Sequence, residues 1–218
     1  MHSFQKLARI APIVFGALAI AACDNPAKDK AQATVSAPVD TPKGAAVTAG
    51  AVEYTVSPPS SKVEWEASKV TKTHTGSFAK FNGSIKLIGD GKPESAKILI
   101  TIDTPSIASD TEKLTGHLNT PDLLDTAKFP TATFESTSIT PGGANGATHT
   151  ITGNLELHGV KKSITFPATV TVDATHATAK AEFVLKRKDF GIVYPGMPND
   201  LIREDVIIRL TIDAPKKG

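Results

Sequence analysis

The segment from Ile151 to Val172 alternates apolar and polar residues with a period of two on both sides of His158-Gly159. Before this break the apolar residues occupy odd positions, and after it they occupy even positions. Because successive side chains of a strand point to opposite faces, each run has one apolar face. A glycine-containing break between two such runs predicts a β-hairpin whose strands turn their apolar faces the same way. Two strands alone are marginally stable in water, so the hairpin requires further strands around a shared core.

Similar alternation recurs over most of the chain, which makes roughly eight strands in total. The additional predicted strands lie at residues 54–56, 61–67, 74–89, 96–102, 133–137, 179–185 and 206–212. One helix is predicted over Ser109–Leu118, with Ser109 or Asp110 as its N-cap. One-sided strands joined by short turns favour antiparallel pairing in either a sandwich or an up-and-down barrel. We favour an all-β barrel of about eight strands with one or two short helices, because closure leaves no exposed sheet edge.

The N-terminus has the features of a bacterial export signal. A short basic segment precedes an apolar run of signal-peptide length, which ends in Ile20-Ala21-Ala22-Cys23. These four residues resemble a lipobox, so residues 1–22 are predicted to be a signal peptide and Cys23 to be lipidated. A plain signal peptide near an unrelated cysteine is the alternative. The protein is expected in the periplasm, anchored to a membrane, and Asp24 favours the inner membrane.

Residues 23–52 contain no aromatic residue and few large apolar ones, so they are predicted to form a disordered tether to a barrel domain at residues 53–218. The chain has 24 basic and 22 acidic residues, and two of the basic residues lie in residues 1–22, which contain no acid. The remainder is therefore neutral overall, which gives no electrostatic reason to expect a nucleic-acid partner. The single cysteine excludes an internal disulfide and a multi-cysteine metal site.

Four blocks of the sequence together resemble the YceI-like family of bacterial periplasmic proteins, whose fold is similar to the lipocalin barrel. These blocks are residues 61–85, 112–136, 153–170 and 185–192, in the order found in the family. The resemblance implies a carrier that binds a polyisoprenoid or an isoprenoid quinone inside the barrel. Family members often have an aromatic pair after the aspartate of the second block, whereas here Leu123-Leu124 follows Asp122.

The inward-facing positions of the predicted strands carry the binding hypothesis. Several of them are small, and in a packed core they would leave voids, whereas in a barrel they leave room for a long apolar chain. The predicted lining consists of Phe81, Ile98, Ile100, Phe134, Leu155, Phe166, Ala179, Ala181, Phe183, Ile208 and Leu210. The apolar segment Gly191–Asp200 is predicted to be a lid over one end of the bound chain. Such binding needs no cofactor, metal or catalytic residue, and the expected partners are a long-chain lipid and the membrane that holds the anchor.

Polar residues support an alternative. His74, His117 and His158 match family positions, but their spacing is not that of metal ligands. A lipid hydrolase or isomerase could use His117 or His158 together with Asp122 or Asp189, although turn and cap roles are commoner for such aspartates. The basic run Lys186–Lys188 could meet a phosphate or form the solvated end of a strand. A stress-related module that binds a protein partner is the third possibility.

Overall fold

A computed structural model of the chain describes residues 25–40 and 51–218. The predicted signal peptide and Cys23 lie outside these residues. The strands are β1 (Thr34–Ser36), β2 (Val52–Val56), β3 (Lys62–Lys69), β4 (Thr73–Phe78), β5 (Phe81–Leu87), β6 (Ala96–Asp103), β7 (Ile107–Ser109), β8 (Thr131–Pro141), β9 (His149–Leu157), β10 (Val160–Val172), β11 (His176–Lys186), β12 (Gly196–Met197) and β13 (Asp200–Pro215). The helices are α1 (Glu112–Leu118) and the 3-10 turns η1 (Pro93–Ser95), η2 (Thr104–Ser106), η3 (Ala144–Gly146) and η4 (Arg187–Phe190).

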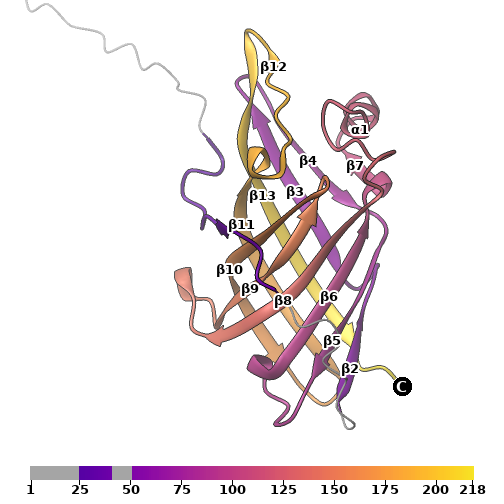
Figure 1. Ribbon diagram of the computed structural model, residues 1–218, viewed down its shortest axis with the longest axis vertical. Coiled ribbons are helices and arrows are strands. Elements are labelled where there is room, and N and C mark those ends of the chain that lie inside the picture. Colours follow the sequence, from indigo (N-terminus) through magenta and orange to yellow (C-terminus); the bar gives the residue numbers. More distant parts are fainter. Residues whose placement is uncertain (1–24, 41–50) are drawn as a thin grey trace, which may run out of the picture.

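The strands form one antiparallel sheet that curls into a barrel, which confirms the predicted fold class (Figure 1). Its hydrogen-bonded order is β2-β5-β6-β8-β9-β10-β11-β13-β3-β4-β7. The sheet returns on itself because β4, near one end of this order, continues into β5, near the other end, and because Tyr54 of β2 bridges Lys216 just beyond β13.

The described strands outnumber the eight expected because some long strands are interrupted and because the short strands β1 and β12 are added. Only Ala79-Lys80 separates β4 from β5, and η2 separates β6 from β7. The second break contains Pro105, which has no N–H group for the sheet ladder. Pairing continues across both breaks, since β5 pairs with β6 and β4 pairs with β7.

The hairpin predicted from the alternation is present as β9 and β10. Leu157 pairs with Val160 across the two-residue turn, and Ile151 pairs with Phe166 farther along. His158 and Gly159 both have positive φ values, 53° and 72°. Two such residues are typical of the type I′ turn, whose twist matches that of the strands it joins.

The prediction of a disordered tether is wrong for residues 25–40. Strands β10 and β11 pair only between Thr169–Val172 and Ala177–Lys180. Farther from the turn that joins them the two strands separate, and the N-terminal segment, residues 25–40, lies between them. Thr34–Ser36 of β1 pairs with Ser163–Thr165 of β10, while Val184 of β11 exchanges backbone hydrogen bonds with Ala31 and Ala33.

The segment is ordered because the barrel wall offers it partners that its own composition does not reveal. Val184 and Ile207 are only 1% exposed, and they form a small buried cluster with Ala27 of the segment. Lys30 donates to Glu182 at 2.6 Å. Residues 25–40 are therefore part of the wall, and Figure 1 shows β1 (indigo) lying along the barrel.

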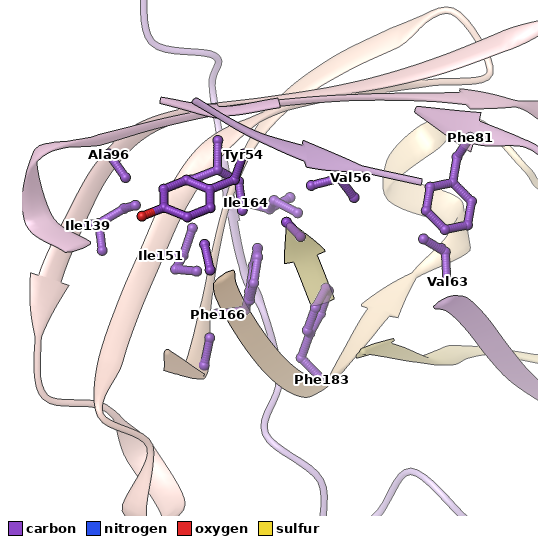
Figure 2. Close-up of a cluster of buried hydrophobic side chains, with 14 of the residues drawn as sticks. Tyr54, Val56, Val63, Phe81, Ala96, Ile139, Ile151, Ile164, Phe166 and Phe183 are labelled. Atoms are coloured by element: carbon purple, nitrogen blue, oxygen red, sulfur yellow. The ribbon is translucent and has the colours of Figure 1, made fainter. Parts of the chain in front are cut away.

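The end of the barrel that carries the chain's C-terminus is closed by packed side chains. Tyr54, Leu87, Ala96 and Ile139 are buried in the main core cluster there, and Figure 2 shows Tyr54 between Ala96 and Ile164. The Tyr54 hydroxyl donates to the carbonyl of Asp173 at 2.8 Å.

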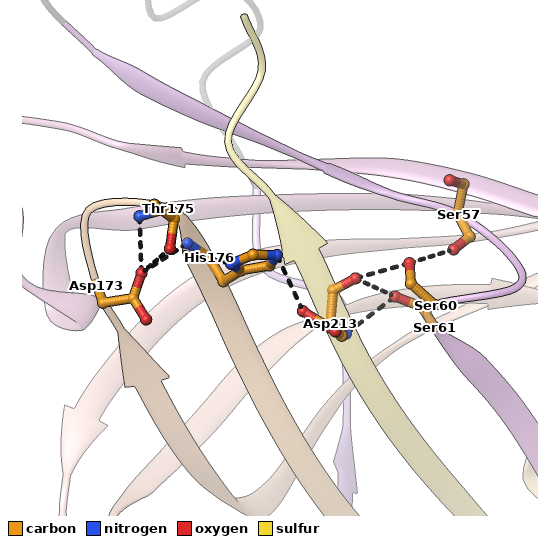
Figure 3. Close-up of polar contacts among 7 residues, drawn as sticks. All are labelled: Ser57, Ser60, Ser61, Asp173, Thr175, His176 and Asp213. Atoms are coloured by element: carbon orange, nitrogen blue, oxygen red, sulfur yellow. Dashed lines mark hydrogen bonds and ion pairs between the residues drawn. The ribbon is translucent and has the colours of Figure 1, made fainter.

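A polar network covers the same end on the outside (Figure 3). Ser60 and Ser61 donate to the carbonyl of Asp213 at 2.9 and 3.1 Å. In the neighbouring turn, Asp173 Oδ1 accepts hydrogen bonds from the backbone N–H groups of Thr175 and His176. The Thr175 N–H is the largest of the contacts that lower the pKa of Asp173 from 3.8 to about 2.

Candidate functional site

The barrel encloses a cavity of about 680 Å³ whose lining is almost entirely apolar. Side chains from strands β3 to β6, β8 to β11 and β13 form its walls. Its exposed lining residues, Thr111, Lys113 and Met197, belong to the N-terminal turn of α1 and to β12. The cavity therefore opens beside α1 and β12, and the packed cluster around Tyr54 closes the opposite end.

Ten of the eleven residues predicted to line a cavity do line it. Phe81 is the exception, because it is buried in the main core cluster without contributing to the lining. Alternation identifies the face on which a side chain lies, but not whether neighbouring side chains fill the space in front of it. Contact of the other ten residues with a ligand stays a prediction.

The small inward residues do not all create space, contrary to the sequence argument. A Cβ at Gly153 would lie 2.4 Å from the ring of Phe134, and one at Gly83 would lie 2.5 Å from Ile100 Cδ1. These two glycines therefore make room for neighbouring side chains. Ala179 and Ala181 do line the cavity, as predicted.

Aromatic rings from three strands form one continuous part of the wall. Phe166 of β10 stacks on Phe183 of β11, with ring centroids 4.2 Å apart and an interplanar angle of 18°. Phe134 of β8 lies against Phe166 at 5.8 Å and is tilted by 54°. Offset stacked and tilted rings pack favourably and present flat apolar surface.

A second apolar cluster surrounds the mouth, and apart from Ile192 in the predicted lid, the sequence argument did not identify it as part of the site. Its buried members are Trp65, Ile107, Leu123, Leu124 and Ile192. All five also line the cavity. The alternation through Trp65 and the Leu123-Leu124 pair were visible in the sequence, but the loops that bring them together are not periodic.

Helix α1 forms one side of this mouth. Its N-cap is Thr111, whose side chain accepts a hydrogen bond from the N–H of Leu114 at 3.4 Å, rather than Ser109 or Asp110. Ser109 instead joins the N-terminal loop by accepting from the Thr111 N–H. Leu114 and Leu118 of the helix pack against the mouth cluster.

The histidines are distributed around this end in different roles. His117 Nε2 lies 3.1 Å from Asp122 Oδ2, and its ring is nearly perpendicular to that of Tyr194, with the ring centroids 5.3 Å apart. His74 Nδ1 lies 2.8 Å from Asp110, and this hydrogen bond lowers the pKa of Asp110.

His158 has the turn position expected for it. Its Nδ1 lies 3.2 Å from the carbonyl oxygen of Phe190. The structure thus brings together one of the His–Asp pairs of the enzyme alternative, His117 with Asp122. Across residues 25–40 and 51–218, no three His, Cys, Asp or Glu side chains are grouped so that they could hold a metal ion.

The basic run Lys186–Lys188 divides between two roles. Arg187 is buried, and it donates to the carbonyls of Ile192 at 2.6 Å, Arg203 at 3.0 Å and Ile202 at 3.1 Å. Burial lowers the pKa of this guanidinium. Lys186 and Lys188 lie 3.3 and 3.9 Å from the carboxylate of Glu204. Arg187 therefore holds both ends of residues 191–203, which we call the mouth segment, a role that its place in a basic run did not indicate.

The segment Gly191–Asp200 lies where the lid was predicted. Ile192 is buried, while Tyr194, Gly196 and Met197 line the cavity. These contacts account for part of its apolar composition, and its movement stays a prediction.

Comparisons with known proteins cover most of the barrel. The family model of the YceI-like domain matches residues 54–214. A UPF0312 protein of Pseudomonas putida strain F1 is 32% identical over 153 residues, which cover 67% of this chain and 78% of that protein. A UPF0312 protein of Azotobacter vinelandii strain DJ is 37% identical over 123 residues, covering 54% of this chain and 62% of that protein.

Solved structures share the fold. BcnA of Burkholderia cenocepacia has a TM-score of 0.62 and 25% identity, over 71% of this chain and 96% of its own. A polyisoprenoid binding domain from Saccharophagus degradans, implicated in plant cell wall breakdown, has a TM-score of 0.59 and 17% identity, over 75% and 98%. Because the family model spans the barrel from β2 to β13 and the fold agrees, the chain belongs to the YceI-like domain family.

Proposed function

We propose that the protein binds one long apolar lipid, of the isoprenoid or quinone type, inside the barrel and carries or stores it without chemical change. The observation that carries this proposal is the apolar cavity of about 680 Å³ that opens at one end. This volume lies within the range of about 300–1,000 Å³ that is usual for small-molecule sites. The S. degradans domain of the same fold is described as polyisoprenoid binding, which supports the same class of ligand here.

Burial of apolar surface is sufficient to drive such binding. Each methylene group removed from water contributes about 0.8 kcal/mol, so ten such groups contribute about 8 kcal/mol before ordering costs. The walls are largely preformed, because the barrel ladder and the aromatic stack hold them. A flexible chain would therefore bear most of the ordering cost itself.

The N-terminal prediction adds a location to this function. We place the carrier in the periplasm with an acyl anchor at Cys23, inner membrane favoured, on the strength of the lipobox-like Ile20-Ala21-Ala22-Cys23. No helix in residues 25–40 and 51–218 is long and apolar enough to cross a membrane. Cell fractionation tests the anchor, since Cys23→Ala should move the protein from the membrane to the soluble fraction. A wild-type chain that is already soluble and has no acyl mass would contradict it.

The proposed function is tested by what the protein retains. The full chain is purified from a bacterial host, extracted with organic solvent and analysed by mass spectrometry. We expect a long-chain isoprenoid or quinone in near-stoichiometric amount, and less of it with the cavity-filling variant Ala181→Phe. Absence of any apolar molecule, together with failure to take up a fluorescent polyene, would remove the proposal.

A second candidate function rests on one contact. His117 and Asp122 are paired at the cavity mouth, where a hydrolase or isomerase would meet the polar end of a lipid. A general acid or base must lie within hydrogen-bond reach of its substrate, and His117 also lines the cavity. Retention of an unmodified lipid by the wild-type protein favours the carrier.

A further inference from the structure

Exposed apolar side chains gather at the open end of the barrel. Six large hydrophobic side chains are exposed among the residues that the structure describes, and four of them belong to the mouth: Val70, Val193, Met197 and Leu201. We call these four the rim patch. Val70 follows β3, while the other three belong to the segment around β12 and to the start of β13.

Main-chain pairing makes three of these residues neighbours. The N–H of Val70 donates to the carbonyl of Leu201 at 3.1 Å. Leu201 in turn pairs with Gly196, and Asp200 pairs with Met197, in the hairpin of β12 and β13. Figure 1 shows this hairpin and the turn between β3 and β4 at the top of the barrel, beyond the ends of the other strands. The rim patch therefore lies on the part of the mouth that projects farthest from the barrel.

The patch is continuous with the inside of the cavity. Met197 lines the cavity and is also 62% exposed. Tyr194, which lies between Val193 and Met197 in the sequence, lines it as well. The acid between the apolar residues is neutralised, because Asp200 accepts from the ammonium of Lys69 and from Thr71. Apolar surface thus runs from the cavity to the outer rim without an uncompensated charge at Asp200.

A phospholipid bilayer is the partner that this arrangement fits. A long apolar lipid dissolves in the bilayer and not in water, so a mouth that faces water would have to release it into an unfavourable medium. Apolar side chains with lysines beside them are the composition of surfaces that enter the membrane interface, since lysine stems lie along apolar surface while their ammonium groups stay in water. Lys72 next to the patch is exposed.

We propose that the rim patch docks on the surface of a phospholipid bilayer, so that the cavity mouth faces the membrane and the lipid passes between them without crossing water. This inference rests on the proposed function, because it assigns the bilayer as the source or destination of the bound lipid.

The test compares one position in the patch with one on the barrel wall. Leu201 and Leu99 are both 49% exposed, and Leu99 lies on β6 away from the mouth. Cys23→Ser removes the only native thiol. In that full chain, Leu201→Cys or Leu99→Cys is labelled with an environment-sensitive fluorophore and mixed with phosphatidylcholine vesicles. Any attachment through the N-terminus is then the same for both proteins.

We expect the emission of the Leu201 label to shift to the blue on vesicle addition, while the Leu99 label stays as in water. Val70→Glu should weaken the vesicle affinity of the Leu201-labelled protein by about tenfold, because it replaces an exposed apolar group of the docking surface by a charge. Both labels responding equally, or neither responding, would overturn the inference. A blue shift of the Leu201 label without vesicles that depends on protein concentration would do so too, since it would indicate a second copy.

Ligand binding without vesicles separates this inference from the proposed function. Trp65 is the only tryptophan, and it lines the cavity, so a polyene that enters the barrel should quench its fluorescence. Quenching by a polyene added in ethanol, combined with a Leu201 label that stays in water on vesicles, would refute membrane docking and leave lipid binding intact. Absence of quenching would refute lipid binding itself.

Discussion

Asn154 and Val39 form a reciprocal pair across the outside of the barrel wall. The N–H of Val39 donates to Oδ1 of Asn154 at 3.0 Å, and Nδ2 of Asn154 donates back to the carbonyl of Val39 at 2.7 Å. Asn154 belongs to β9 and is only 2% exposed, because the N-terminal segment that contains Val39 covers it. The two hydrogen bonds mimic one step of a strand ladder and secure the end of the segment beyond β1.

Asn154→Ala should loosen this segment. Each net hydrogen bond contributes about 1 kcal/mol, so we expect the free energy of unfolding to fall by about 1–2 kcal/mol. Amide hydrogen exchange at Ala33 and Val35 should accelerate, since these residues lie in the part of the segment that the pair secures. Asn82→Ala on the exposed face of β5 is the matched control and should change stability by less than about 0.5 kcal/mol. Unchanged exchange in Asn154→Ala would mean that β1 holds the segment by itself.

Acid should release the same segment. The hydrogen bond from Lys30 is the largest contact that lowers the pKa of Glu182 below 4.5, and Arg209 lowers it further. A carboxylate with a lowered folded-state pKa stabilises the fold above its unfolded pKa and loses this contribution as pH falls through the folded value. Protease cleavage within residues 25–36 should therefore increase below about pH 4.5, relative to pH 7. The Glu182→Gln variant should be cleaved faster than the wild type at pH 7, and its cleavage rate should change less with pH.

Filling the cavity should weaken lipid binding. Ala181→Phe places a ring in the lining, and exclusion of about two methylene-sized units from the ligand site corresponds to about a tenfold loss of affinity. Lys180→Phe adds the same ring at the adjacent, exposed position of β11 and should leave affinity unchanged. A polyene titration read from Trp65 fluorescence measures both. Equal affinities would show that the ligand does not occupy this part of the cavity.

Arg187→Met should free the mouth segment. The substitution leaves the carbonyls of Ile192, Ile202 and Arg203 without their donor, and each buried unsatisfied group costs about 1–3 kcal/mol. Hydrogen exchange of residues 191–203 should accelerate, and bound lipid should dissociate faster because Tyr194 and Met197 lie in this segment. Lys188→Met, at an exposed position of the same turn, serves as the control.

His117→Gln distinguishes the two candidate functions. A carrier should bind the polyene with unchanged affinity, because apolar burial drives binding. A lipid hydrolase or isomerase should lose turnover by roughly 100-fold or more when its general acid or base is removed. The measurement requires an assay of lipid-ester cleavage or isomerisation by the wild type beside the binding titration. Turnover that disappears with His117 would establish the enzyme.

The sequence by itself determined the elements that depend only on residues close together in the chain. Alternation with a break at His158-Gly159 predicted the β9–β10 hairpin, because the period of two links each residue to a face and the turn needs residues that accept positive φ. The same alternation identified ten residues of the cavity lining in advance. Alternation could not separate Phe81 from the lining residues, because it identifies the face on which a side chain lies and not whether other side chains pack against that face.

The tertiary structure decided the features that depend on distant partners. Residues 25–40 have too little apolar surface to order alone, and they are ordered because β10 and β11 separate and leave backbone groups and Val184 uncovered. Arg187 is buried because its guanidinium donates hydrogen bonds to three carbonyls of the mouth segment. The partners of residues 25–40 lie more than 100 residues away, and those of Arg187 lie 5 to 16 residues away, so neither set belongs to a local alternation. No local pattern records such a partner, because it exists only once the barrel has closed.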